Sequence, residues 1–227
     1  MEPSTFLASP ARGFTLVEML VVLSIIAIIT TIALFGQSTF NRSVLLTDAS
    51  YTVALSLREM QSLGLSSRKF SGVQNAGYGG RFTGSGNSFL LFADIGGASP
   101  GTNCPVGQSL AAGNPEKKPG NCVYNAGTDG IVRTYTFNRG FSISRICGTA
   151  MVGGAEYCST DGTPLTAVDV VFIRSNTTDT IMTGQRSGSP VTLSKAEIYI
   201  KDADSLSSRG ICISQLGQVS VSFGDCP

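Results

Sequence analysis

The sequence predicts an α+β protein in which a long N-terminal helix, with a membrane half and an amphipathic half, packs on an antiparallel β-sheet. Three observations lead to this prediction. A long apolar run begins at residue 14, a segment with helical periodicity follows it, and short strand candidates separated by Gly, Pro, Asn and Ser fill most of the remaining chain of 227 residues. A helix followed by a run of strands is typical of the α+β class.

Residues 14–36 form the predicted membrane half of the helix. Glu18 is the only charged residue between Phe14 and Gly36. A helix of this length spans a hydrocarbon core of about 30 Å, because each residue adds about 1.5 Å. An acid in such a helix is opposed by about 2.5 kcal/mol or more, which makes Glu18 a functional candidate. The alternative is that Glu18 lies at the membrane surface and its carboxylate reaches water.

Residues 37–70 form the predicted amphipathic half of the helix. Apolar residues recur there at intervals of three and four, whereas the charged residues fall between them. The predicted core-facing stripe consists of Leu46, Ala49, Val53, Leu57 and Met60. We expect one continuous helix from about Phe14 to Leu65, with Gly36 and Gly64 as its weak points because glycine is a poor helix former.

Residues 71–227 form the predicted β-rich globular domain, with loops that contain cysteines. Six strand candidates are rich in β-branched and aromatic residues, at 88–95, 131–137, 168–173, 195–200, 210–215 and 218–223. The last two flank Leu216 and Gly217, which predicts a hairpin. The segment from 96 to 130 contains several prolines, and we expect it to be a surface insertion.

The composition narrows the functional classes. The chain contains no histidine, which removes the commonest catalytic base and the commonest metal ligand. Because there is no CxxC pair either, we expect no zinc site. We also expect no cofactor and no catalytic residue. Asp94 with Asn103, or Asp202 with Asp204, offers oxygen ligands for calcium, but acids in Gly-rich turns are usually turn formers. The net charge of +1 gives no general attraction to nucleic acid.

The six cysteines all lie beyond the apolar helix, at Cys104, Cys122, Cys147, Cys158, Cys212 and Cys226. This distribution predicts disulfides in a domain outside the cytoplasm, and the alternative is a set of free buried thiols. Six cysteines allow about 15 pairings, and the sequence does not choose among them. We favour nearest neighbours, because each bridge would then close a Gly-rich or terminal loop and add about 3 kcal/mol. The favoured pairs are Cys104 with Cys122, Cys147 with Cys158, and Cys212 with Cys226.

The residues before the apolar run carry a resemblance to a known family. Ordinary export signals place the cleavage site after the apolar region, whereas here Arg12 and Gly13 come before it. The stretch GFTLVE at 13–18, followed by the apolar helix, resembles the prepilin signal of type IV pilins and type II secretion pseudopilins. The resemblance implies a pilin-like fold, residues 1–13 as the leader, cleavage after Gly13 by a prepilin peptidase, and methylation of the new amine of Phe14.

Three looser matches resemble the GspH/FimT branch of H-type pseudopilins and minor pilins. They are LREMQSLGLSSRKF at 57–70, GYGGRF at 77–82 and RGICISQLGQVSVS at 209–222. The resemblance implies a minor pilin or pseudopilin, a non-catalytic subunit of a type IV pilus or a type II secretion filament. The implied partners are other pilin or pseudopilin subunits, prepilin peptidase, an inner-membrane assembly platform and, before assembly, membrane lipid. The implied location is the cytoplasmic membrane, with the globular domain outside the cytoplasm, and then the filament.

Glu18 is the predicted assembly residue. A free amine at Phe14 and the helix dipole both favour an anion within the first turn. Glu18 lies four residues after Phe14 and can also meet the amine of a neighbouring chain, which pairs two charges that lipid penalises.

Two other functions stay open from the sequence. One is a tip minor pilin for DNA uptake or adhesion, although the acidic C-terminal end and the near-neutral charge argue against nucleic acid as a partner. The other is a membrane-tethered extracytoplasmic binding protein or enzyme, in which residues 14–36 are only a tether. The junction of Gly13 and Phe14 favours the filament subunit, because a tether needs neither a cleavage glycine nor an acid four residues later.

Overall fold

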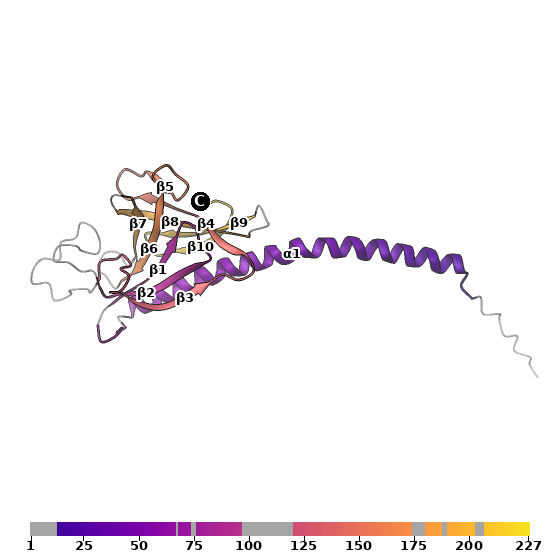
Figure 1. Ribbon diagram of the computed structural model, residues 1–227, viewed down its shortest axis with the longest axis horizontal. Helices are drawn as coiled ribbons and strands as arrows, with labels where there is room; N and C mark the ends of the chain where they lie inside the picture. Colours follow the sequence, from indigo (N-terminus) through magenta and orange to yellow (C-terminus); the bar gives the residue numbers. More distant parts are fainter. Residues whose placement is uncertain are drawn as a thin grey trace, which may run out of the picture. The chain divides into compact units, whose positions relative to one another are not determined.

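The computed structural model describes residues 13–66, 68–73, 76–96, 120–173, 180–187, 190–202 and 207–227, and for residues 35–39 it gives the backbone alone. One helix, α1 (Leu16–Leu65), precedes the strands in this part of the chain (Figure 1). The strands are β1 (Gly77–Thr83), β2 (Ser88–Asp94), β3 (Gly130–Thr136), β4 (Phe141–Ala150), β5 (Glu156–Cys158), β6 (Leu165–Phe172), β7 (Thr180–Arg186), β8 (Val191–Asp202), β9 (Ser208–Ser214) and β10 (Val219–Phe223). The predicted α+β class is confirmed.

The chain divides into two compact units, Met1–Arg42 and Ser43–Pro227. The first unit contains the apolar part of α1, and every side chain described there between residues 13 and 34 is exposed. Within it, Leu16–Leu34 is long and apolar enough to cross a membrane, as judged by length and composition. This segment agrees with the membrane half that the sequence predicts.

The second unit is built on an antiparallel sheet that gathers around the second half of α1 (Figure 1). Its strands follow the order β10-β9-β8-β7-β6-β1-β2-β3, and β4 pairs with both β8 and β5. The long strand β8 makes this branching possible. Its first residues, 191–193, pair with β7, and its remaining length pairs with β4 on one side and β9 on the other.

The second half of α1 supplies one wall of the core. Its buried side chains follow the predicted stripe, and those at most 1% exposed include Leu46, Val53, Leu57 and Met60. Ala49 is partly buried against the same cluster, which also holds large side chains from the sheet. Full burial of a large apolar side chain stabilises the fold by about 1.5–3 kcal/mol, so this stripe fixes α1 to the sheet.

Both outer strands of the sheet reach the same turn of α1. Arg58 donates a hydrogen bond to the carbonyl oxygen of Val219 in β10, at 3.3 Å. The next residue, Glu59, forms an ion pair with Arg133 of β3, at 3.9 Å. Because the ion pair is largely exposed, we expect it to add little stability. The two contacts nevertheless show that the sheet curves far enough for β3 and β10 to flank one helix.

Gly64 is a packing contact between α1 and β6, a role that the sequence analysis did not predict. α1 continues through Gly36 and Gly64 and ends at Leu65. A Cβ atom at residue 64 would lie 2.2 Å from the backbone oxygen of Phe172 in β6. The missing side chain therefore allows the helix and the strand to approach each other, which is a common use of glycine.

The six predicted strands correspond to β2, β3, β6, β8, β9 and β10, whereas β1, β4, β5 and β7 were not predicted. The predicted hairpin is confirmed, because β9 pairs with β10 across a turn in which Gly217 has a φ of 76°. Most of the predicted insertion, residues 97–119, lies outside the described residues.

Candidate functional site

The start of α1 is capped by three reciprocal hydrogen bonds between Thr15 and Glu18. The backbone N–H and the hydroxyl of Thr15 both donate to Oε2 of Glu18, at 2.9 and 3.0 Å. In return, the backbone N–H of Glu18 donates to the hydroxyl of Thr15, at 3.2 Å. This arrangement is a capping box, which satisfies N–H groups that the first turn of a helix otherwise leaves without partners.

The capping box assigns a role to Thr15 that the sequence analysis missed, although the pattern T-x-x-E was visible. Within one chain the carboxylate of Glu18 turns back to Thr15, while the side chain of Phe14 is 82% exposed. The pairing of Glu18 with the Phe14 amine of a neighbouring chain stays a prediction. A carboxylate that is already held at the helix start would be positioned for such a partner.

The polar side chains inside the apolar segment are satisfied by the helix itself. Ser24 donates to the carbonyl oxygen of Leu20 at 2.8 Å, and Thr31 donates to that of Ala27 at 2.7 Å. Thr30 likewise bonds to a preceding carbonyl, that of Ile26, at 2.8 Å. Hydroxyl groups that bond in this way leave no free donor for lipid to penalise, so the segment suits a hydrocarbon environment.

Within the described residues of the second unit, disulfides join Cys147 to Cys158 and Cys212 to Cys226. Both belong to the nearest-neighbour pairing that the sequence favours. The first joins directly opposed residues of β4 and β5, and the second ties the C-terminal end to β9. Cys104 lies outside the described residues, so its pairing with Cys122 stays a prediction.

Each of the two oxygen-ligand pairs that were weighed for calcium has one member outside the described part of the chain. Asn103 and Asp204 lie outside it, and both oxygens of Asp94 accept backbone hydrogen bonds. Cys147, Glu156 and Cys158 do place their ligand atoms within 4.8 Å of one another. However, the two sulfur atoms are joined in a disulfide, so they are not available as thiolate ligands.

Two buried carboxylates organise the loop before β3. Asp94, at the end of β2, accepts the backbone N–H groups of Asn121 and Cys122 at 3.1 and 2.7 Å. Asp129 accepts N–H groups from both sides of this loop, those of Gly96 and Asn125, at 2.7 Å each. These bonds satisfy backbone groups that no strand pairs. Asp94, which was weighed as a turn former, thus bonds to backbone groups 27 and 28 residues farther along the chain.

A third acid lies nearby on the central strand β6. Asp169 is fully buried and forms an ion pair with Arg81 of β1, at 3.1 Å. Burial raises the pKa of Asp169 to about 7, although Arg81 acts to lower it. Burial also raises the pKa of Asp94 to about 8, and the charges of Asp129 and Asp169 add to this rise against the lowering effect of the two backbone hydrogen bonds.

We expect the chain to lose stability as the pH rises from about 5 to 8. Asp94 and Asp169 hold their protons in the folded state at pH values where the unfolded chain has released them, so folding is favoured by acid across this window. With no histidine in the chain, few other groups titrate there. Thermal unfolding followed by circular dichroism should give a higher Tm at pH 5, and Asp94→Asn should flatten this dependence. A wild-type Tm that stays unchanged or rises toward pH 8 would contradict this prediction.

The N-terminal segment that contains Thr15 and Glu18 is similar to a known sequence motif. Residues 9–34 match the family model described as the prokaryotic N-terminal methylation motif. The match covers Gly13, Phe14, Thr15 and Glu18 together with the apolar run, and it supports a prepilin-type, pilin-like protein. Such a motif implies recognition by a prepilin peptidase and assembly with other pilin subunits. No curated protein and no solved structure matches the chain. The GspH/FimT branch stays a prediction.

Proposed function

We propose that this chain is a minor pilin or pseudopilin, a non-catalytic subunit of a type IV pilus or type II secretion filament. The observation that carries the proposal is the methylation motif at residues 9–34, joined to a helix segment whose apolar side chains are all exposed. Exposed apolar surface of this extent needs a cover. Lipid provides that cover before assembly, and the packed helices of neighbouring subunits provide it in the filament.

The proposal assigns a role to each segment of the chain. Residues 1–13 are the leader, and residues 14–36 are the membrane-spanning part that becomes the filament core. Residues 37–70 connect this part to the β-rich domain of residues 71–227, which lies outside the cytoplasm. An inner-membrane assembly platform then moves the subunit from lipid into the filament.

A second apolar surface on α1 supports assembly with other subunits. Val44, Tyr51 and Leu55 are 50%, 54% and 61% exposed, and their spacing of seven and four residues places them on one helix face. This face is opposite to the core-facing stripe, because the stripe residues are buried by the sheet. A subunit that packed against α1 in a filament would remove these three side chains from water.

We expect the mature protein to begin at Phe14 and to carry a methylated amine. A Cβ atom at Gly13 would meet nothing within 4 Å, so Gly13→Leu should leave the fold intact and block only the peptidase. Intact-mass and N-terminal analysis of protein from its host tests this, with Gly13→Leu as the matched uncut variant. A wild-type chain that begins at Met1, or one cut after residue 36, would overturn the proposal.

A further inference from the structure

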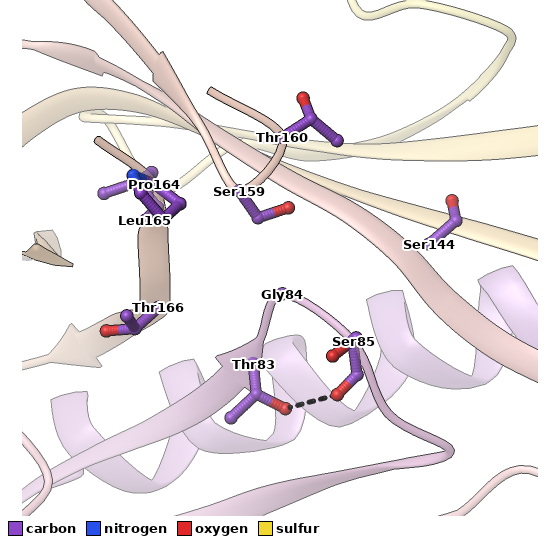
Figure 2. Close-up of a pocket in the computed structure, with 9 residues that line it drawn as sticks. All are labelled: Thr83, Gly84, Ser85, Ser144, Ser159, Thr160, Pro164, Leu165 and Thr166. Atoms are coloured by element: carbon purple, nitrogen blue, oxygen red, sulfur yellow. Dashed lines mark hydrogen bonds between the residues drawn. The ribbon is translucent and has the colours of Figure 1, made fainter. Parts of the chain in front are cut away.

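A pocket of about 460 Å³ lies on the second unit. It forms where the turn after β1, the strand β4 and the loop between β5 and β6 meet. Figure 2 shows Ser159 above Gly84, with Ser85 and Ser144 on one side and Thr166 on the other. Its lining consists of Thr83, Gly84, Ser85, Ser144, Ser159, Thr160, Pro164, Leu165 and Thr166. Six of these nine residues carry a hydroxyl group, and none carries a charge.

The pocket exists because strand pairing along β4 is interrupted at Ser144. On one side of this residue, the N–H of Ile143 donates to the carbonyl oxygen of Gly86 at 2.8 Å. On the other side, the N–H of Ser159 donates to the carbonyl oxygen of Ile146, also at 2.8 Å. Between them the register of β4 against β8 shifts, which is typical of a β-bulge. A gap is thus left between the two flanking loops.

The absence of a side chain at Gly84 leaves this gap unfilled. A Cβ atom at Gly84 would lie 2.5 Å from the Cβ of Ser159, so any side chain at residue 84 would push the two walls apart or fill the space between them. Gly84 also donates its N–H to the carbonyl oxygen of Thr166, at 3.3 Å, which holds the turn against β6. Gly84 therefore lets its turn approach Ser159 closely, and its hydrogen bond holds the backbone of the turn in place.

Several contacts stabilise the β5–β6 loop, which forms one wall of the pocket. The Cys147–Cys158 disulfide fixes its start, and the side chain of Asp161 accepts the N–H of Cys158 at 2.5 Å. Farther along, Arg186 stacks over the ring of Tyr157 at 3.9 Å and donates to the hydroxyl of Thr163 at 3.0 Å. A pocket held in this way is formed before a ligand arrives, as ligand sites usually are.

The hydroxyl groups of the lining divide into acceptors and donors. Ser144 and Thr166 donate to the carbonyl oxygens of Tyr199 and Gln185, so each keeps free lone pairs but no free proton. Ser159 instead acts as an acceptor within the protein, because its Oγ accepts the N–H of Ile146 at 3.2 Å. Its hydroxyl proton therefore stays available to a ligand.

Two further hydroxyl groups can both donate and accept hydrogen bonds. The side chains of Ser85 and Thr160 make no hydrogen bond within the described residues, so each offers a donor and acceptors. The hydroxyl of Thr83 donates to the backbone oxygen of Ser85 at 3.5 Å, shown by the dashed line in Figure 2. The pocket therefore presents donors and acceptors side by side, without any charged group to favour an ion.

We propose that this pocket binds a neutral saccharide. Each hydroxyl of a sugar is both a donor and an acceptor, which matches the mixed set of groups around the pocket. Pro164, which is half-buried, adds an apolar surface against which the C–H groups of a sugar ring can lie. The volume falls within the range of about 300–1,000 Å³ that is usual for small-ligand sites. A charged sugar is disfavoured because no lining residue pairs with its charge.

The test uses the full mature chain in a zwitterionic detergent, because sugar-headed detergents would compete for the pocket. Saturation-transfer NMR and calorimetric titration are run with glucose, galactose and N-acetylglucosamine. N-acetylneuraminic acid serves as the charged probe, and the peptide Gly-Ser-Gly serves as a neutral probe that is not a sugar. We expect at least one of the three neutral sugars to bind, and to bind more tightly than the acid or the peptide.

Variants then assign the binding to the pocket. Thr160→Val and Ser85→Ala each remove a hydroxyl with no described internal partner, so the fold should be kept, and each should weaken binding about fivefold. Ser220→Ala removes an exposed hydroxyl on β10, outside the pocket, and should change nothing. The proposal is overturned if none of the neutral sugars binds, if only the peptide binds, or if binding is unaffected by both pocket variants.

Discussion

Replacement of Glu18 by alanine is expected to abolish incorporation of the chain into filaments while leaving membrane insertion and folding intact. Removing a charge from an apolar helix favours lipid, and the hydrogen bonds described for Glu18 stay within the first turn of α1. Incorporation should fail because the incoming Phe14 amine would lose its partner in a medium of low dielectric constant. Deletion of one member of a buried charge pair costs about 3 kcal/mol or more.

Two further variants separate this pairing from the capping box. Thr15→Ala removes the hydroxyl that bonds to Glu18 but keeps the carboxylate, so it should cost the helix about 1 kcal/mol and still assemble. Glu18→Gln keeps the shape and loses the charge, so it should fail as alanine does. Membrane-fraction level, N-terminal processing and recovery in sheared filaments are measured for each. Normal recovery of both Glu18 variants would refute the pairing mechanism.

The second large effect is expected at Gly64, where the helix meets β6. In Gly64→Ala the new Cβ would lie 2.2 Å from the carbonyl oxygen of Phe172, a backbone atom that can move only together with its strand. Overpacking of this kind costs about 1–3 kcal/mol, and alanine returns about 1 kcal/mol through its better helix propensity. Because the clash is with backbone, we expect a net loss of about 2 kcal/mol.

Gly162→Ala is the matched control for Gly64→Ala, since a Cβ at residue 162 would meet nothing within 4 Å. Thermal and denaturant unfolding of the detergent-solubilised chain should show a lower midpoint for Gly64→Ala only. Equal midpoints for Gly64→Ala and the wild type would mean that α1 and β6 separate without cost, and that the close approach is not a constraint on the fold.

The strands that the sequence analysis missed differ from the predicted ones in identifiable ways. β1 contains the stretch GYGG, and glycine is normally depleted in strands. Gly79 is nevertheless required, because a Cβ there would lie 2.3 Å from the backbone oxygen of Val170 in β6. β5 is only three residues long and pairs only with β4, held by a disulfide. By contrast, the first part of β4 alternates buried and half-buried residues. The matching alternation of apolar and polar residues is visible in the sequence and predicts a strand.

The N-terminal site was more predictable than the interior of the domain. Gly13, Phe14 and Glu18 lie within a short contiguous motif, so their relation needs no knowledge of the fold. The roles of Asp94 and Asp169 depend on partners far along the chain, Cys122 in a loop and Arg81 on another strand. Local periodicity contains no information about such contacts. The pocket is harder still to predict from the sequence, because it arises from a gap in the pairing of β4.

The contacts of β3 and β10 with adjacent residues of α1 have a consequence for the order of folding. α1 is made first and β10 last, yet β9 and β10 contribute Ile211, Ile213 and Val219 to the cluster that buries the helix stripe. Contacts between such distant parts of a chain form slowly. The strands β1 and β2 cover part of the stripe early, but its cover is complete only once β9 and β10 are made, and apolar surface that is still uncovered promotes aggregation. Synthesis of β9 and β10 is thus the step that completes the apolar core around the helix.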